Sequence, residues 1–345
     1  MEVIAGRAAF LSDRKIGIND GERVITFKRA VIAVGSKPIE LFGRGPGFYD
    51  TDGIFEISEL PKSVVIVGGG AVGVEMASFF SALACEVSVV EAMDEILPFA
   101  DQEVTGVLKR EFKKNGVTLL TGAKISNAWS DGGVCKMELE DGRTMNSEAV
   151  VIAAGRKPNL AGLGLDKAGV AVGIGGNVEV DEAMSTTRGG IFAVGDAAGK
   201  RQLAYTAHHE GLVAGRNILG RPSRMDYRAV PSIVFSGPEI ACIGPTENQM
   251  ARTGVKTRVG RHHVRALARA QACGETTGMF KVIEGEDHSI LAVHIASPYA
   301  TEIIHGAVTA MRAGMTVAEL AGTVFGHPTF SEGISLAAED AIRHG

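Results

Sequence analysis

The hydrophobic pattern is clearest between residues 63 and 90. Ser63–Val67 is an unbroken, mostly β-branched run, which is typical of a strand buried on both faces of a parallel sheet. Apolar residues then recur at helical spacing over 71–83, and Glu86–Val90 returns to strand character. This pattern predicts a strand, a helix and a second strand parallel to the first.

The pattern after residue 101 changes from one helix to several short strands. A second helix is predicted over 102–115, because Gly116 stands where a helix favours glycine and two lysines occupy the last turn. Residues 117–155 indicate short strands, with turns at Asp131-Gly132 and Asp141-Gly142. The segment therefore continues the α/β pattern.

An internal repeat relates two parts of the chain. Val31-Ile-Ala-Val-Gly-Ser-Lys-Pro38 recurs as Val151-Ile-Ala-Ala-Gly-Arg-Lys-Pro158, with six of eight positions identical. The second copy reaches Gly155 87 residues after Gly68, whereas only 34 residues precede Gly35. We therefore expect two related modules, the first of which lacks its beginning.

The C-terminal part of the chain has a different pattern of predicted strands and helices. A strand-and-glycine segment from Ile191 to Gly199 precedes a predicted helix over 203–219. Strands are then predicted around 232–235, 240–243 and 291–295, and helices over 300–313 and 331–342. The predicted fold is α/β, with two Rossmann-like dinucleotide-binding modules, the first incomplete, followed by an α+β C-terminal domain.

Composition narrows the class of protein. The 345 residues are 45% hydrophobic and carry a net charge of −5, which argues against disorder, membrane embedding and nucleic acid as a partner. The four cysteines lie far apart in sequence, and His208-His209 and His262-His263 have no ligand at customary spacing, so no metal site is predicted. This cysteine usage favours a reducing compartment, most simply the cytoplasm.

The glycine motif Gly68-x-Gly70-x-x-Gly73 lies between the first predicted strand and its helix. Its glycines suit a tight turn, close approach of backbone to a pyrophosphate, and close packing of helix on strand. Glu91 ends the next strand, where a carboxylate would accept hydrogen bonds from ribose hydroxyls and repel a 2′-phosphate, which favours NAD over NADP. The alternative is a glycine-rich turn beside a solvated glutamate.

A histidine and a glutamate stand five residues apart near the C-terminus. In His327-Pro-Thr-Phe-Ser-Glu332, a carboxylate that holds the ring would fix its tautomer and make the distal nitrogen more basic. Such a pair suits proton exchange with a thiol or hydroxyl near neutral pH. The alternative is a loop histidine fixed by Pro328, with Glu332 as a first-turn helix residue.

Several motifs together resemble those of the flavoprotein disulfide reductases, the pyridine nucleotide-disulfide oxidoreductases. In chain order they are Val65-Ile-Val-Gly-Gly-Gly-Ala-Val-Gly-Val-Glu75, Val89-Val-Glu91, Ala153-Ala-Gly-Arg-Lys-Pro-Asn159, Ile191-Phe-Ala-Val-Gly-Asp196, Pro238-Glu-Ile-Ala241 and His327-Pro-Thr-Phe-Ser-Glu332. The chain is most similar to the lipoamide dehydrogenases, because of Glu91, the Leu336-Ala-Ala-Glu-Asp340 stretch and the absence of a C-terminal cysteine pair. The resemblance covers essentially the whole chain.

The resemblance implies a role for each matching position. NAD would be bound by Gly68, Gly69, Gly70, Ala71, Val72, Gly73, Glu91, Ile125 and Gly155, with Glu75 near the nicotinamide. FAD would be contacted by Gly35, Asp196 and Ala204, and His327 oriented by Glu332 would be the acid-base residue. In such enzymes dihydrolipoamide reduces a cysteine pair, and the electrons pass through FAD to NAD.

The resemblance also implies partners and a domain plan. Members dimerise through the C-terminal domain and can serve 2-oxoacid dehydrogenase complexes through lipoyl domains. The plan implies a residual FAD-binding module at 1–57, an NAD-binding domain at 58–155, a returning FAD-binding segment at 156–226 and a dimerisation domain at 227–345.

The chain departs from the family pattern at its redox centre. Neither a glycine fingerprint for FAD nor C-x-x-x-x-C occurs in it. We expect about the first hundred residues of such an enzyme to be missing, and the polypeptide alone to bind FAD poorly and have little dithiol activity. Two alternatives remain: a disulfide-independent transhydrogenase or diaphorase, and a non-catalytic NAD-binding dimer.

Overall fold

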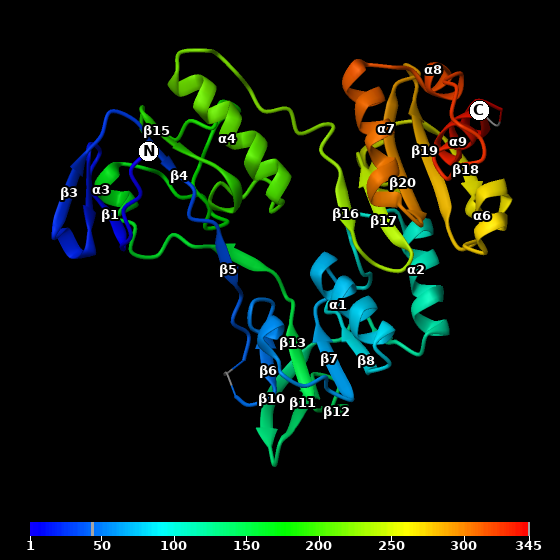
Figure 1. The fold of residues 1–345 in the computed structure, drawn as a ribbon, viewed down its shortest axis with the longest axis horizontal. Helices are drawn as coiled ribbons and strands as arrows, with labels where there is room; N and C mark the ends of the chain where they lie inside the picture. Colours follow the sequence, from blue (N-terminus) through cyan, green and yellow to red (C-terminus); the bar gives the residue numbers. More distant parts are fainter. Residues whose placement is uncertain (43–44, 344–345) are drawn as a thin grey trace. The chain divides into compact units, whose positions relative to one another are not determined.

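The computed structural model describes residues 1–42 and 45–343, which form two compact units (Figure 1). One unit combines residues 1–39 with 156–227, and the other combines 40–155 with 228–345. Each unit therefore contains two stretches that are distant in sequence.

A parallel sheet forms the first half of the larger unit. Its central strands are β7 (Ser63–Val67) and β8 (Glu86–Val90), joined by α1 (Ala71–Ala82), so the predicted strand-helix-strand unit is confirmed. The five strands lie in the order β6-β13-β7-β8-β9, with every neighbour parallel. The edge strands are β6 (Phe48–Asp50) and β9 (Thr118–Leu120), and β13 (Ala149–Ile152) lies between β6 and β7.

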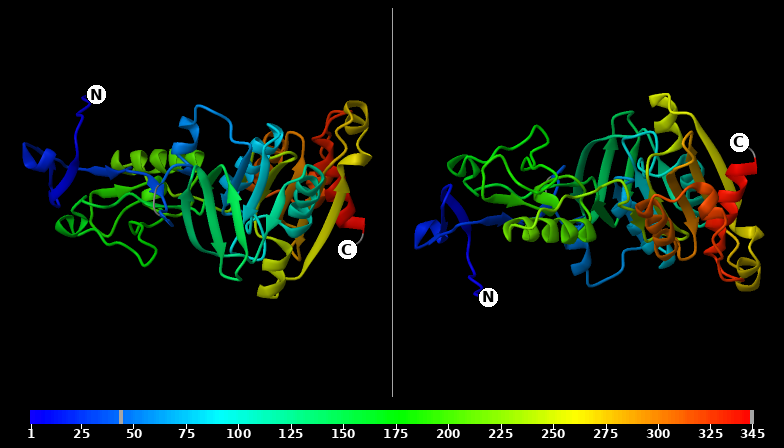
Figure 2. Two further views of the ribbon diagram at one scale, coloured as in Figure 1. Left: turned by 90° about the horizontal axis from the view of Figure 1, so that it is seen from below. Right: turned by 90° about the horizontal axis from the view of Figure 1, so that it is seen from above.

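Both faces of this sheet are covered by other elements. Alternate residues of β7 point to opposite sides and therefore contact different neighbours. Val64 and Ile66 pack with α1 and with α2 (Gln102–Lys114), whereas Val65 and Val67 pack with an antiparallel sheet on the other face (Figure 2). That sheet consists of β10 (Ile125–Asp131), β11 (Val134–Leu139) and β12 (Thr144–Ser147). Burial on both faces explains the unbroken apolar run seen in the sequence.

An antiparallel sheet forms the second half of the larger unit. Its strands lie in the order β16 (Ser232–Val234), β17 (Glu239–Ile243), β20 (Ile290–Ser297), β19 (Met279–Gly285) and β18 (Thr257–His263). The chain is completed by α5 (Glu247–Thr253), η4 (Val264–Ala266), α6 (Ala268–Cys273), α7 (Ala300–Ala313), α8 (Val317–Ala321) and α9 (Glu332–Arg343). The predicted α+β character of this region is confirmed.

The two faces of the antiparallel sheet have different neighbours. Phe280 and Ile295 pack with α7 and α9, whereas Cys242 and Ala296 share a core with α1 and α2. At Gly260 of β18 an added Cβ would lie 1.9 Å from the carbonyl oxygen of Ala337 in α9. Glycine therefore lets α9 lie directly on the strand.

The smaller unit contains fewer and shorter elements. A parallel pair, β4 (Ala30–Ile32) and β15 (Ile191–Ala193), lies beside α4 (Ala204–Ile218) and the 3₁₀ turn η3 (Gly195–Ala197). The remaining elements are β1 (Ala8–Ser12), β2 (Lys15–Ile18), η1 (Asn19–Gly21), β3 (Arg23–Thr26) and α3 (Leu165–Ala168), with η2 (Gly53–Glu56) in the larger unit. The two copies of the repeat meet here, because β5 (Ser36–Pro38) pairs antiparallel with β14 (Arg156–Pro158).

A buried ionic cluster joins the two sheets of the larger unit. The Lys281 ammonium, only 1% exposed, lies 2.7 Å from Asp101 Oδ1, 2.5 Å from Glu103 Oε2 and 2.6 Å from Glu247 Oε2. Arg261 contacts Glu103 and Glu247 at the rim. A buried charge is tolerated only with such partners, so the cluster fixes α2 and α5 against β19.

Asp101→Asn is expected to make the free energy of unfolding less dependent on pH in the acid range. Burial alone would raise the pKa of Asp101, but the hydrogen bond and charge of Lys281 outweigh it and lower that pKa. A lowered carboxyl pKa stabilises the fold above the unfolded-state pKa, about 3.9, and this stabilisation is lost as the pH falls below it. We expect the variant to be less stable at pH 7 by about 1–3 kcal/mol, and the difference to shrink in acid.

Urea unfolding at pH 7 and at pH 3.5 measures this difference. Asp131→Asn is the matched control, because Asp131 pairs with Lys136 at an exposed hairpin, where an ion pair contributes little. A gap between wild type and Asp101→Asn that is equal at both pH values would contradict the expectation.

Candidate functional site

The Gly68–Gly73 turn has little space on its protein side and open space on its outer side. Gly68 has a φ of +110°, and a Cβ there would lie 2.5 Å from the carbonyl oxygen of Ala153. A Cβ at Gly73 would lie 1.9 Å from the carbonyl oxygen of Gly68. At Gly70, by contrast, no atom lies within 4 Å of an added Cβ. The turn therefore leaves room for a ligand at the N-terminus of α1, where amide groups favour a phosphate.

Glu91 lies beside this turn, directly after β8. Its Oε2 accepts a hydrogen bond from the amide of Gly69 at 2.5 Å, and its Oε1 accepts one from the amide of Met93 at 2.6 Å. Each carboxylate oxygen can accept a second hydrogen bond. The predicted acidic residue thus stands at the turn with capacity to bind ribose hydroxyls.

The other residues predicted for NAD gather at the same edge. Ala71 and Val72 begin α1, and Gly155, with a φ of +107°, follows the end of β13. Ile125 begins β10, and the amide of Ala123 just before it donates to the carbonyl of Glu91 at 2.9 Å. Carboxyl ends of parallel strands are where such sheets bind ligands.

Glu75 lies on α1 at the side of a cavity that the sequence did not reveal. Its Oε1 accepts a hydrogen bond from the amide of Phe235 at 2.9 Å, and burial raises the pKa of the carboxyl. The cavity has a volume of about 580 Å³ and is lined by Glu75, Ser78, Phe79, Ser81, Ala82, Phe112, Asn115, Phe235, Ser236 and Gly237. The cavity is formed where α1, α2 and the segment after β16 meet, which no local pattern signals.

The smaller unit brings together the positions predicted for FAD. Gly35, with a φ of +65°, precedes Ser36, whose hydroxyl donates to Asp196 Oδ2 at 2.5 Å. Asp196 lies in η3, and the amide of Gly195 donates to buried Glu210 of α4 at 2.6 Å. Ala204 is the exposed first residue of α4.

The contact between His327 and Glu332 that the sequence predicted is formed. His327 Nδ1 lies 3.1 Å from both oxygens of Glu332, whose Oε2 also accepts a hydrogen bond from the amide of Thr329 at 3.2 Å. The His327 side chain is 69% exposed, whereas that of Glu332 is 15% exposed. Glu332 is therefore fixed by the protein, and Nε2 of the ring is left to meet a reactant.

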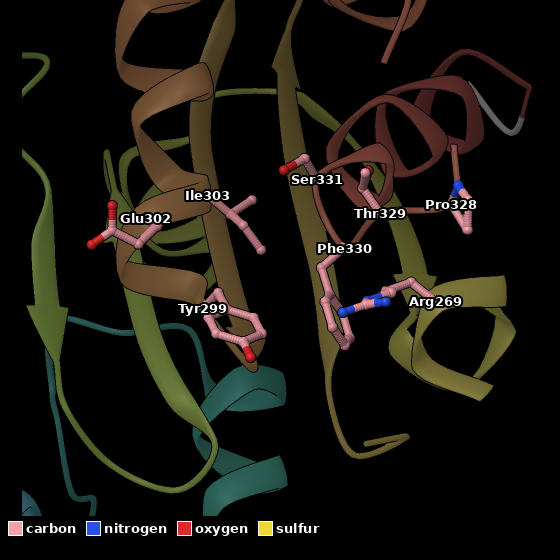
Figure 3. Close-up of a pocket in the computed structure, with 8 residues that line it drawn as sticks. All are labelled: Arg269, Tyr299, Glu302, Ile303, Pro328, Thr329, Phe330 and Ser331. Carbon is pink, nitrogen blue, oxygen red and sulfur yellow. The ribbon is translucent and has the colours of Figure 1, made fainter. Parts of the chain in front are cut away.

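A cavity lies next to this pair (Figure 3). It has a volume of about 480 Å³ and is lined by Arg269, Tyr299, Glu302, Ile303, Pro328, Thr329, Phe330 and Ser331. The rings of Tyr299 and Phe330 are 5.8 Å apart, and Figure 3 shows Arg269 extending toward Phe330. The sequence did not indicate Arg269 or Tyr299, because the cavity depends on contacts between α6, α7 and the loop before α9.

All four cysteines, which lie in the described part of the chain, are free. Cys135 and Cys242 are buried, and burial raises the pKa of both thiols. Burial also raises the pKa of the Cys85 thiol, and Cys273 is exposed on α6. A raised pKa disfavours the thiolate, which is the reactive form of cysteine.

Comparison with known proteins matches both halves of the chain to one family. The profile described as pyridine nucleotide-disulphide oxidoreductase matches residues 1–211, and that of the dimerisation domain of the same family matches residues 230–338. A dihydrolipoyl dehydrogenase of Geobacillus stearothermophilus is 35% identical over 99% of this chain and 74% of its own length. One of Thermus scotoductus is 36% identical over 98% of this chain and 75% of its own length.

The fold is also similar to solved structures. The HOCl-induced flavoprotein disulfide reductase RclA of Escherichia coli, in a mutant bound to Cu(II), superposes with a TM-score of 0.91 at 28% identity. The match covers 98% of this chain and 78% of that one. The similarity therefore extends through both units and the C-terminal sheet.

Proposed function

We propose that this chain, which belongs to the pyridine nucleotide-disulphide oxidoreductase family, provides the NAD site, the FAD contacts and the acid-base residue of a dihydrolipoamide-oxidising enzyme. It is an NAD-dependent flavoprotein oxidoreductase of the lipoamide dehydrogenase type, with FAD and NAD as cofactors. FAD supplies the two-electron chemistry between a dithiol and NAD in this family.

NAD would bind at the Gly68–Gly73 turn. The open space at Gly70 would admit the pyrophosphate, and the N-terminus of α1 would stabilise its charge through the amides near Ala71 and Val72. Glu91 would accept hydrogen bonds from the ribose, and Ile125 and Gly155 would also contact NAD. Glu75 would lie nearer the nicotinamide.

FAD would be contacted by the smaller unit, where Gly35, Asp196 and Ala204 lie. This proposal is supported by the association of residues 1–39 with 156–227. We accordingly propose residues 1–39 and 156–226 for FAD, 58–155 for NAD and 227–345 for dimerisation. The end of the first FAD-binding module moves from residue 57 to residue 39, because β6 pairs with β13 in the parallel sheet of the larger unit.

The contact between His327 and Glu332 carries the proposal. Glu332 would hold the Nδ1–H of the ring, so that Nε2 accepts the proton of a substrate thiol and makes the thiolate available. The partly apolar cavity lined by Tyr299 and Phe330 would receive the hydrocarbon arm next to the dithiol of dihydrolipoamide.

Glu332→Gln is expected to change the tautomer of His327. In the wild type the carboxylate selects the Nδ1–H form, and ¹⁵N NMR at pH 8 should show Nε2 without a proton. The variant, which no longer presents a carboxylate, should populate the Nε2–H form. Glu339→Gln on the same helix is the control, because Glu339 pairs with Arg343 instead.

A His327 ring that is already in the Nε2–H form in the wild type would refute the assignment. In an enzyme completed with a redox cysteine pair, His327→Gln should lower the rate of dihydrolipoamide oxidation by about 10²–10⁴-fold, the usual contribution of a general acid-base group.

A second candidate function is NADH oxidation without a disulfide, as in a diaphorase. It is favoured by the burial of Cys135 and Cys242 and by the raised pKa of the Cys85 thiol. No pair among the four cysteines is placed to form the redox couple that dithiol oxidation requires.

The C-terminal domain is the dimerisation domain of the family, which supports a homodimer. We further propose service to 2-oxoacid dehydrogenase complexes, in which a lipoyl domain would present its dithiol to His327. In the part of the chain that the structure describes, every helix is too short or too polar to span a membrane. The four free thiols favour a cytoplasmic location.

A further inference from the structure

The 91–101 loop connects the proposed NAD turn to the buried ionic cluster around Lys281. The loop leaves β8 at Glu91 and ends at Asp101, which caps α2 by accepting a hydrogen bond from the amide of Glu103 at 3.1 Å. One end of the loop therefore belongs to the turn, and the other belongs to the cluster.

The turn end of the loop is held by hydrogen bonds and packing. The amide of Leu97 donates to the carbonyl of Gly69 at 2.9 Å, and the amide of Gly69 donates to Glu91. Ile96 also lies against Gly69, where an added Cβ would be 2.7 Å from its Cγ2. Residues of this one loop thus hydrogen-bond both the N–H and the carbonyl of Gly69 and pack against its α-carbon.

The loop contains one residue, Leu97, in a backbone conformation that L residues rarely adopt. Leu97 has a φ of +48°, a region that L side chains rarely adopt, and it is fully buried. The amide of Ala100 bonds to the carbonyl of Leu97 at 2.8 Å, so a single tight turn separates Leu97 from Asp101. A displacement of Asp101 would therefore be transmitted to Leu97.

The cluster end of the loop is held by residues of the C-terminal sheet and α5. Asp101 Oδ1 lies 2.7 Å from Lys281 Nζ, and Oδ2 accepts a hydrogen bond from the amide of Glu247 at 3.1 Å. The amide of Asp101 donates to Nδ1 of buried His294 at 3.4 Å. These three polar partners of Asp101, which lie outside its helix, thus all come from beyond residue 227.

We propose that Lys281 is a positioning residue for NAD binding: through Asp101 it holds the 91–101 loop in the strained conformation that orients Gly69 at the phosphate-binding turn. The inference rests on the NAD site of the proposed function. It predicts that the C-terminal domain, besides its part in dimerisation, sets the affinity of the chain for NAD.

The test combines NADH binding with local hydrogen exchange in the Lys281→Met variant. Methionine keeps an unbranched side chain, one atom shorter than that of lysine, and removes the charge. Asp101→Asn provides a second variant that keeps the helix cap, and the double variant leaves neither Lys281 nor Asp101 with an unpaired charge. Lys136→Met at the exposed β10–β11 hairpin is the matched control.

NADH dissociation constants are measured by fluorescence at 25 °C, and exchange of the Leu97 and Gly69 amides is measured by NMR without nucleotide. We expect Lys281→Met to weaken NADH binding about tenfold (~1.4 kcal/mol). Exchange of the Leu97 amide should become about tenfold faster, with β7 and β13 unchanged. Lys136→Met should alter neither quantity.

If Lys281 has only a structural role, Lys281→Met will lower the melting temperature but leave the NADH dissociation constant within twofold of wild type and the Leu97 amide equally protected. That result would overturn the inference. If Lys281→Met does not fold, the same two results in Asp101→Asn or the double variant decide. A wild-type chain that does not bind NADH refutes the proposed NAD site, whereas the exchange result judges the role of Lys281 separately.

Discussion

Gly70→Ala is expected to weaken NADH binding at least tenfold while leaving the stability of the fold almost unchanged. Gly70 has a φ of −72°, and an added Cβ meets no protein atom within 4 Å. The methyl group would stand in the space that the pyrophosphate needs, so the lost affinity would be about 1.4 kcal/mol or more. The change in melting temperature should be no more than about 2–3 °C.

Gly73→Ala provides the contrast within the same turn. Its Cβ would lie 1.9 Å from the carbonyl oxygen of Gly68, a contact that only a shift of the backbone can relieve. We expect a loss of about 1–3 kcal/mol in the free energy of unfolding, together with lost binding. Calorimetric titration and thermal melts on both variants separate the ligand contact from the packing contact. Normal NADH affinity in Gly70→Ala would place the nucleotide elsewhere.

The 345-residue polypeptide is expected to bind NADH but to show no dihydrolipoamide oxidation by itself. Oxidising a dithiol to a disulfide requires an acceptor couple, which in this family is a cysteine pair. Cys135 and Cys242 are inaccessible, burial raises the pKa of the Cys85 thiol, and Cys273 stands alone on α6. None of them can supply a reactive couple under ordinary conditions.

An assay of NAD reduction by dihydrolipoamide, with FAD added, measures this directly. A parallel assay with NADH and an artificial electron acceptor tests the diaphorase alternative. A version with all four cysteines replaced by serine is the control, and it should behave like the wild type in the acceptor assay if it folds. Dihydrolipoamide turnover that disappears in this version would show that the cysteines act in a way that the structure does not suggest.

The elements that the sequence predicted best are those with a local signal. The turn at Gly68–Gly73, α1 and α7 follow from glycine placement and helical periodicity, and the structure confirms them. The contact of His327 with Glu332 was also predictable, because only five residues separate them and Glu332 begins a helix. Local patterns sufficed because the interacting groups are close in sequence.

The elements that the sequence missed depend on distant contacts. The strand β19 contains Lys281 and Glu284, which look solvated in sequence but are buried because their partners lie elsewhere. Asp101 is 180 residues from Lys281 in the chain, so no spacing rule could pair them. The strand β18 carries four basic residues among its seven, and its position is set by α9 through Gly260.

For the internal repeat, the sequence predicted the strands but not how they pair. Its identity predicted two similar strands, and β4 and β13 are those strands. That Lys37 and Lys157 would face each other in an antiparallel pair was not predictable, because strand pairing depends on the fold as a whole.

A calorimetric titration of the chain with NADH and with NADPH tests the proposed nucleotide site. We predict that NADH binds once per subunit and that NADPH binds at least tenfold more weakly, since Glu91 would repel a 2′-phosphate at the turn. Equal or tighter binding of NADPH, or no binding of either nucleotide, would contradict the assignment of the Gly68–Gly73 turn and Glu91 as an NAD site.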